Sequence, residues 1–598
     1  MKRIVYHLIA CFVLLFGLTL LSYDVLSPVA EEEEALLDYK AVDFIKPIDL
    51  PFKLSGNFGE IRTNHFHSGL DIKTNGEIGY PVYSIGDGYV SRIKISSYGY
   101  GKAIYITHPN GFTSVYAHLN EITGEAGKYL KSQQYNRKKF SVDLYPSKDM
   151  IKIRQGQVVA KSGNSEGSGG PHLHFEIRET ASSKPINPLK FNYALPDSIS
   201  PLIESVSFYA INDNSGIVAS NTFKAAKKLT LPVKKVNGVY RVDIQHPIKI
   251  KGRIGFGVET FDRASLAPNT LGVYSIDTYV DGKRISYFKS DKFSFKESRY
   301  VNSLIDFEEK YNHNKVISRT YRTYRLPGNK LSLYKDMQDK GIYNFGDEKD
   351  EKDIVIVVKD IANNTSVLKF KVQVSEEFFL FDRDHAVDKE MYFYNTINEL
   401  EKSDIYAKFP KYSFYKSFFF KHENIEPNDK QACYSPIHKL DEPSVPVHRY
   451  YELKIKPTKY EERLKDKYLI ASIDKDGNFE SEGGTFIDGF VYTKTRVLGK
   501  FTVVVDSIAP IIKPVNVYEG KNVRGQRYID FEVIDDFTGI DYFEGTLDDQ
   551  WILLDYDAKK NRLRYIIDEY LTPGQHQIRI VASDEKGNES YIKLQIVS

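Results

Sequence analysis

Short alternating segments separated by glycine turns run from Pro51 to about Ile177, and they constrain the fold more than any other feature. Residues 81–85 lead into the turn Gly86-Asp87-Gly88, and residues 103–107 end at the hairpin signal His108-Pro109-Asn110-Gly111. The chain also holds 43 Tyr and 36 Phe, whose rings pack well on pleated surfaces. This part of the sequence therefore predicts an antiparallel β-domain.

A second pattern begins beyond Pro201, where strand-like segments end in turns that contain aspartate. Four such turns occur, at residues 262–264, 360–363, 474–478 and 584–588. Around the last turn, apolar residues at 578, 580 and 582 alternate with Arg579 and Val581, as in a hairpin that buries one face. The spacing favours successive β-sandwiches, the last of which is similar to bacterial immunoglobulin-like domains.

The length of 598 residues is too great for a single core, so we predict a mainly β chain of several domains. The predicted parts are an N-terminal hydrophobic helix that is a signal peptide or membrane anchor at 1–22, a linker at 23–48, the antiparallel β-domain at 49–195, β-sandwich regions at 200–375 and 376–507, and an immunoglobulin-like domain at 508–598.

The N-terminal segment has the pattern of an export signal. Lys2 and Arg3 precede an apolar run over residues 4–21, which reaches the lower limit for crossing a bilayer. No good cleavage site follows, so an uncleaved anchor in the inner membrane is favoured over a cleaved signal. The positive charges place the rest of the chain outside the cytoplasm, in the cell envelope or periplasm. Cys11 and Cys433 are the only cysteines, so no disulfide is expected in the folded part.

Charge argues against one class of partner. The net charge of +2 creates no global field that attracts nucleic acid, and no nucleic acid is expected. A locally basic stretch lies between Leu119 and Ile151. Its simplest interpretation is a solvated loop, and the alternative is a basic lip that attracts an anionic polymer.

Histidines and one aspartate in the first domain have the spacing of metal ligands. His67 and Asp71 flank Ser68-Gly69-Leu70, where glycine allows a bend, and His172 and His174 point to one face if their segment is a strand. Three ligands, namely His67, Asp71 and one histidine of the pair, leave a zinc position open, as in catalytic sites. Such an ion lowers the pKa of bound water to about 7. His118 and the other histidine then remain to accept a proton or stabilise an intermediate.

The motifs HFHSGLDI at 65–72, YAHL at 116–119 and GPHLHFE at 170–176 resemble those of the LytM/lysostaphin-type zinc endopeptidases. The resemblance covers about residues 50–190. It implies the duplicated hybrid motif fold, Zn²⁺ ligands at His67, Asp71 and His174, and catalytic histidines at His118 and His172. It also implies that the substrate is the peptide part of bacterial peptidoglycan, hydrolysed by metal-activated water.

Two functions stay open at this point. The first is an exported zinc endopeptidase that cuts peptide stems or cross-bridges of peptidoglycan. The second is a non-catalytic envelope scaffold or regulator that binds wall peptides or a partner protein. The β-sandwiches are possible docking modules for an envelope protein in either case.

Overall fold

The structure is a computed structural model that describes residues 38–598 except 166, 194, 220–224, 245, 267, 313–314, 347–349, 376–388 and 428–431. The predicted signal or anchor at 1–22 lies outside the described residues, as does most of the predicted linker. Among the helices that are described, none is both long and apolar enough to cross a membrane. Residues 44–598 form one compact unit, and its structure is mainly β, as predicted.

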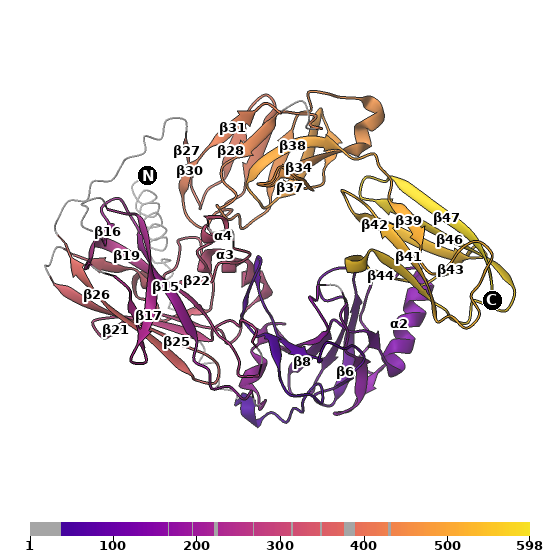
Figure 1. The fold of residues 1–598 in the computed structure, drawn as a ribbon, viewed down its shortest axis with the longest axis horizontal. Coiled ribbons are helices and arrows are strands. Elements are labelled where there is room, and N and C mark those ends of the chain that lie inside the picture. The colour runs from indigo at the N-terminus through magenta and orange to yellow at the C-terminus, as the bar shows by residue number, and fades with distance from the viewer. Residues whose placement is uncertain are drawn as a thin grey trace, which may run out of the picture. The chain divides into compact units, whose positions relative to one another are not determined.

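The predicted antiparallel domain is built on one nine-stranded sheet with the order β1-β4-β13-β8-β7-β6-β10, to which β11 and β14 add at β6 and β13 (Figure 1). All its pairs are antiparallel. Its strands are β1 Leu54–Gly56, β4 Leu70–Lys73, β6 Gly88–Ile95, β7 Lys102–Thr107, β8 Phe112–Ala117, β10 Val142–Leu144, β11 Lys152–Ile153, β13 His172–Glu179 and β14 Pro185–Ile186. Two small sheets complete it, β2 Ile61–Arg62 with β3 His65–Phe66, and β5 Pro81–Tyr83, β12 Val158–Lys161 and β9 Glu121–Ile122.

The basic stretch between Leu119 and Ile151 contains a helix, so its interpretation as a loop was wrong. Helix α2 spans Gly124–Arg137 and ends at Lys138, which adopts the left-handed conformation. Its residues are mostly good helix formers such as Glu, Lys, Leu and Gln. Only Ala126 and Gln134 are buried, so the sequence lacks the apolar periodicity that normally signals a helix.

Strand β13 lies in the middle of the sheet, between β4 and β8, and this position creates the site. His174 is the cross-strand partner of Asp71 on one side and of Ala117 on the other. The alternate residues Leu173, Phe175 and Ile177 are fully buried on the opposite face. The histidines project from one face of β13, because the residues on its other face pack in the hydrophobic core.

Next along the chain is a twelve-stranded sheet system with helices α3 Val301–Leu304 and α4 Glu309–Asn312. Its strands are β15 Leu202–Ala210, β16 Gly216–Val218, β17 Lys228–Val236, β18 Val239–Val242, β19 Ile248–Phe261, β20 Ser275–Val280, β21 Lys283–Lys289, β22 Thr320–Arg322, β23 Tyr334–Lys335, β24 Tyr343–Phe345, β25 Glu351–Lys359 and β26 Thr365–Val374. Three residues around hairpin β2–β3, namely Phe58, Ile61 and Phe66, belong to its hydrophobic core. Phe58 and Phe66 both pack on Phe293, with ring centroids 5.1 and 5.5 Å away.

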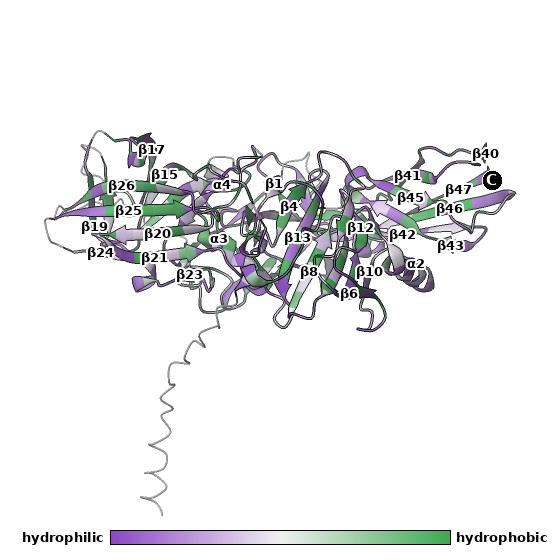
Figure 2. Cartoon of the chain, turned by 90° about the horizontal axis from the view of Figure 1, so that it is seen from below, coloured by the Kyte–Doolittle hydropathy of each residue, from purple (hydrophilic) through white to green (hydrophobic). Residues whose placement is uncertain are grey.

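The remaining chain forms further sheets, antiparallel except for the pair β40–β47, with alternating buried and exposed residues. Green and purple stretches mix along these strands in Figure 2, as along β46 and β47. Residues 390–505 form β27 Glu390–Tyr392, β28 Asn398–Glu401, β29 Ile405–Phe409, β30 Phe418–Phe420, β31 His422–Ile425, β32 Ile437–Leu440, β33 Tyr451–Ile455, β34 Tyr468–Ile473, β35 Phe479–Ser481, β36 Thr485–Ile487, β37 Phe490–Thr495 and β38 Gly499–Val505. The last strands are β39 Ile511–Pro514, β40 Lys521–Asn522, β41 Tyr528–Ile534, β42 Ile540–Leu547, β43 Gln550–Ile552, β44 Leu554–Asp557, β45 Arg562–Ile566, β46 Gln575–Asp584 and β47 Glu589–Val597.

Short 3-10 helices connect some of these strands. They span Tyr39–Ala41, Pro188–Lys190, Phe295–Tyr300, Gln338–Gly341, Glu462–Lys467 and Ala558–Lys560. The domain boundaries predicted from the sequence stay predictions, and so does the immunoglobulin-like character of residues 508–598.

Candidate metal centre

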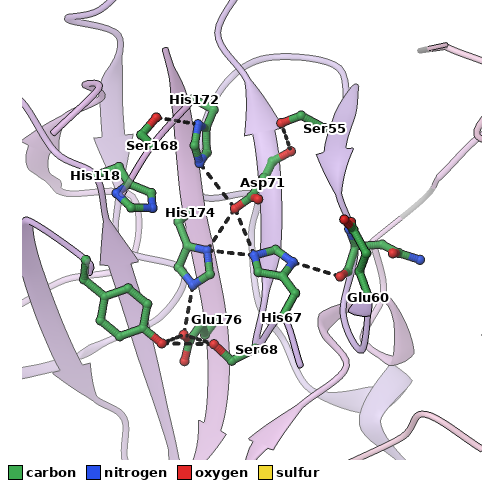
Figure 3. A network of polar contacts seen from close by, with 12 residues as sticks. Ser55, Glu60, His67, Ser68, Asp71, His118, Ser168, His172, His174 and Glu176 are labelled. Carbon is green, nitrogen blue, oxygen red and sulfur yellow. Dashed lines mark hydrogen bonds and ion pairs between the residues drawn. The ribbon is translucent and has the colours of Figure 1, made fainter. Parts of the chain in front are cut away.

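Three of the five predicted site residues bring ligand atoms together in one buried cluster (Figure 3). His67 lies in the turn after β3, Asp71 on β4 and His174 on β13. Asp71 Oδ1 lies 3.0 Å from His67 Nε2 and 2.9 Å from His174 Nδ1, and the two nitrogens are 3.1 Å apart. A tetrahedral zinc ion with ligands at 2.0–2.1 Å holds them about 3.3 Å from one another, so the spacing fits.

The outer hydrogen bonds of the two histidines decide which nitrogen faces the centre with a lone pair. His67 Nδ1 is 2.8 Å from the Asn57 carbonyl, and His174 Nε2 is 2.9 Å from Glu176 Oε1. Both partners only accept, so these outer nitrogens carry the protons. Two imidazole lone pairs and a carboxylate oxygen then converge at one point. Such an arrangement is stable when a cation lies between them, and the donor set suits zinc.

The two carboxylate oxygens of Asp71 have different partners. Oδ1 faces the histidines, whereas Oδ2 accepts a hydrogen bond of 3.0 Å from Arg62 Nη2. Burial alone raises the pKa of Asp71, but its interactions with His67, His172 and His174 hold this pKa well below its usual value. Asp71 is therefore a carboxylate anion at all physiological pH values. Arg62 was not predicted from the sequence, because no local pattern connects it to Asp71.

Glu176 is a supporting residue that the sequence analysis missed. Its carboxylate is fully buried and accepts hydrogen bonds from His174 Nε2, from Ser68 Oγ at 2.6 Å and from Arg178 Nε at 2.5 Å. Burial opposes ionisation, but Arg178 and His174 lower the pKa of Glu176. The period-two pattern that relates His172 to His174 also points to residue 176. The same reasoning, continued by two residues, predicts this contact.

His118 and His172, the two predicted non-ligand histidines, lie beside the cluster with ring centroids 4.9 Å apart. His172 Nδ1 is held by the Gly170 carbonyl at 2.8 Å and Ser168 Oγ at 3.0 Å. Its Nε2 is buried and lies 3.3 Å from Asp71 Oδ1, without a hydrogen bond. His172 therefore directs this nitrogen toward the centre, beside Asp71.

His118 follows β8 directly and adopts a positive φ of 56°, which is uncommon for a residue other than glycine. Its Nδ1 is 2.9 Å from the Ser165 carbonyl, so the ring is held from the side away from the cluster. Burial and the neighbouring His174 and His172 lower the pKa of His118 to about 3. The imidazole is therefore neutral at physiological pH, and its strained backbone is typical of a functional position.

Glycine is needed at position 69 for close packing rather than for the bend that was predicted from the sequence. A Cβ atom at this position would lie 2.3 Å from the carbonyl oxygen of Phe175 on β13. The segment between His67 and Asp71 therefore passes directly against the strand that carries His174. Glycine permits this close approach, which brings the donor groups of His67, Asp71 and His174 to one point.

Comparison with known proteins identifies the domain around this centre. Residues 65–135 match Peptidase family M23. The chain carries an M23 (LytM-type) peptidase domain. The match ends before β13, so His172 and His174 are placed by the geometry of the sheet rather than by the matched segment. Residues 389–506 match the Zu5-like domain, inside the region predicted as 376–507. Zinc is the cofactor of the M23 domain, in agreement with its His-Asp-His donor set.

The relatives resemble only part of this chain. Peptidoglycan DD-endopeptidase ShyA of Vibrio cholerae serotype O1 is 29% identical over 170 residues, 27% of this chain and 33% of the relative. DD-carboxypeptidase/endopeptidase Mpg of Neisseria meningitidis serogroup B is 27% identical over 172 residues, 28% of this chain and 33% of the relative. A solved zinc-containing peptidase from Vibrio cholerae is 26% identical, covering 26% of this chain and 41% of that one with a TM-score of 0.18. The chain thus spans about a third of the length of these curated relatives.

Proposed function

We propose that this chain is a zinc-dependent endopeptidase that hydrolyses amide bonds in the peptide stems or cross-bridges of peptidoglycan. The observation that carries the proposal is the convergence of two imidazole lone pairs and one carboxylate oxygen from His67, His174 and Asp71. Zinc bound there supplies a Lewis acid for the scissile carbonyl and lowers the pKa of water. The similarity to a peptidoglycan DD-endopeptidase and to a DD-carboxypeptidase/endopeptidase supports the choice of substrate.

The roles of the remaining site residues follow from their hydrogen bonds. His172 keeps Nδ1 on the Gly170 carbonyl and can exchange a proton through Nε2. His118 is neutral and fixed through Nδ1, so it can donate or accept at the other nitrogen without a change of position. Asp71 and Glu176 stay charged and keep the ligands oriented. The two non-ligand histidines therefore move protons during amide cleavage.

Digestion of purified peptidoglycan by the full chain tests the proposal. We expect release of soluble muropeptides that stops with the zinc chelator 1,10-phenanthroline and returns when zinc is added back. Mass spectrometry of products from defined cross-linked muropeptides identifies the bond that is cut. Binding of wall material with no release, by a chain that contains one equivalent of zinc, would contradict the enzyme and support the scaffold or regulator.

The location proposed with this activity is outside the cytoplasm, with the chain anchored in the inner membrane through residues 4–21. It is supported by Lys2 and Arg3 before the apolar run. Fractionation of cells that express the chain should recover it with inner membranes, and external protease should digest it once the outer barrier is opened. Recovery as a shortened chain free of membranes would show a cleaved signal instead.

A further inference from the structure

A cluster of three carboxylates, separate from the zinc centre, lies where the chain enters the twelve-stranded sheet system. It joins Asp197, which leads into β15, Asp262 at the end of β19, and Asp360 after β25. One carboxylate oxygen from each lies within 4.8 Å of the other two. Asp262 and Asp360 are 3% and 2% exposed. Three acidic groups this close repel one another unless a cation or proton separates them.

One oxygen of this cluster has no hydrogen-bond partner. Asp262 Oδ1 is buried and unpaired, although its two neighbours are well held. Asp360 accepts from the backbone and side-chain nitrogens of Asn364 at 2.8 and 2.7 Å, and Asp197 Oδ1 accepts from Ser265 N at 3.1 Å. Among the described residues, no Lys or Arg forms an ion pair with any of the three. Burial and the charge of Asp360 raise the pKa of Asp262 to about 7, which shows that negative charge here is poorly compensated.

The last domain contains a similar arrangement, in which one asparagine bridges two aspartates but no third carboxylate joins them among the described residues. We call this arrangement the aspartate–asparagine frame and use it as an internal comparison. Asn364 Nδ2 donates to the Asp197 carbonyl at 3.2 Å and to Asp360 Oδ2 at 2.7 Å. Asn588 Nδ2 donates in the same way to the Asp506 carbonyl at 3.2 Å and to Asp584 Oδ2 at 2.6 Å.

The two frames differ in the side chain that lies next to the first aspartate, which is Asp197 in one frame and Asp506 in the other. Asp506 Oδ2 accepts a hydrogen bond of 2.7 Å from Thr538, and no three-residue acidic cluster forms there among the described residues. The aspartate–asparagine frame is therefore a feature of the fold. The buried, unpaired Asp262 is the addition that is specific to the first site.

We propose that Asp197, Asp262 and Asp360 bind a calcium ion. All three donors are hard carboxylate oxygens, which Ca²⁺ and Mg²⁺ prefer and zinc does not. Calcium accepts oxygen ligands at 2.3–2.6 Å, so oxygens on opposite sides of the ion are about 4.6–5.2 Å apart. The three oxygens all lie within 4.8 Å of one another, close enough for one such ion to contact all of them. The ion would fasten the segment that leaves the peptidase domain to the ends of β19 and β25.

The test measures calcium binding by the full chain, loaded with one equivalent of zinc and freed of calcium. We expect calorimetry with CaCl₂ to show one site that Asp262→Asn removes, and calcium to raise the unfolding temperature of wild type by roughly 5 °C. Asp262→Asn should unfold no lower than calcium-free wild type, because it removes an uncompensated charge. Asp506→Asn, in the frame without the third carboxylate, is the matched control and should retain the calcium site.

Asp197→Asn gives a second measurement at a half-buried position, where folding is tolerant of the change. It should weaken calcium binding at least tenfold. Absence of calcium binding by wild type, equal binding by Asp262→Asn and wild type, or equal affinity for Mg²⁺ and Ca²⁺ would overturn the proposal. Loss of peptidoglycan hydrolysis alone would not overturn the calcium proposal, because hydrolysis depends on the zinc centre.

Discussion

His172 and His174 leave the same face of β13, yet their hydrogen bonds give them different roles. His174 has both nitrogens engaged, one in the ligand cluster and one on Glu176. His172 Nδ1 donates to the Gly170 carbonyl, and its Nε2 lies 3.3 Å from Asp71 Oδ1 without a hydrogen bond. The backbone alternation alone does not separate the two residues, because it treats positions 172 and 174 alike.

Substitution of each histidine should separate metal binding from proton transfer. We expect His174→Ala to lose both zinc and turnover, because one of three ligands is removed. His172→Ala should keep about one equivalent of zinc and lose turnover by 10²-fold or more, the usual effect of removing a group that transfers a proton. Zinc content by metal analysis and muropeptide release measure the two effects. Retention of zinc by the first variant and its loss from the second would reverse the assignment.

Zinc affinity should depend on pH through His174. Burial lowers its pKa, but Asp71 and Glu176 raise it further, to about 9 from an ordinary 6.5. In the metal-free chain this proton stabilises the fold below pH 6.5, and the contribution is lost as pH rises through about 9. Zinc must displace the proton, so its apparent affinity should rise about tenfold per pH unit from 6.5 to 9 and then level off.

Competition with a chromophoric chelator between pH 6.5 and 9.5 measures this slope. His172→Ala is the control, and its slope should match that of wild type, because His172 is not a ligand in this assignment. A zinc affinity that stays constant across that range would contradict the displacement of a proton from His174.

At the scale of elements, the close approach of the His67–Asp71 segment to β13 determines the geometry of the centre. Gly69→Ala places a methyl group against the Phe175 carbonyl, so the two segments must separate. Overpacking of this kind costs about 1–3 kcal/mol, and here it also moves two ligands. We expect a lower unfolding temperature and zinc affinity reduced at least tenfold.

Gly169→Ala is the matched control for that substitution. Gly169 lies in the loop before β13, and an added Cβ meets no atom within 4 Å. Zinc affinity and unfolding temperature should stay close to wild type. If both variants bind zinc equally well, the close approach at Gly69 does not control the centre.

At the scale of the whole molecule, the peptidase domain shares apolar packing with the sheets that follow it. Phe58, Ile61 and Phe66 are at most 5% exposed and belong to the same core as Phe293. The Phe66 amide also donates a 2.8 Å hydrogen bond to Ser298 Oγ. His67, one of the three proposed ligands, follows Phe66 directly, so this packing supports one side of the proposed zinc centre.

A fragment of residues 45–200 should therefore be less stable than the same domain in the full chain. Truncation exposes three large apolar side chains next to His67, each worth about 1.5–3 kcal/mol when buried. We expect a lower unfolding temperature and weaker zinc binding than in the full chain. Replacement of all three side chains by polar residues should make the fragment more soluble, but its zinc affinity should stay below that of the full chain. Equal zinc affinity of fragment and full chain would show that the shared packing is dispensable.

Much of the architecture was predictable because its signals are local. The strands at 81–83 and 102–107 coincide with segments that were predicted from alternation and glycine turns. Helix α2 was missed because its exposed surface is polar and its buried residues are few. The same period-two alternation predicts that Glu176 lies on the face of His174. It does not predict the contacts of Arg62 and Phe293, because these depend on how distant segments pack.

The types of donor and their order can be read from the amino-acid sequence, because His67, Asp71, His118, His172 and His174 are recognised by spacing and motif. Which of their atoms meet depends on how distant segments pack. The register of β4 on β13 sets Asp71 opposite His174, and outer hydrogen bonds select the lone pairs that face the centre. The same holds for Asp197, Asp262 and Asp360, which are separated by 65 and 98 residues and become neighbours only when the sheets assemble. Local sequence determines side-chain chemistry and strand period, whereas contacts between distant segments depend on the packing of the whole chain.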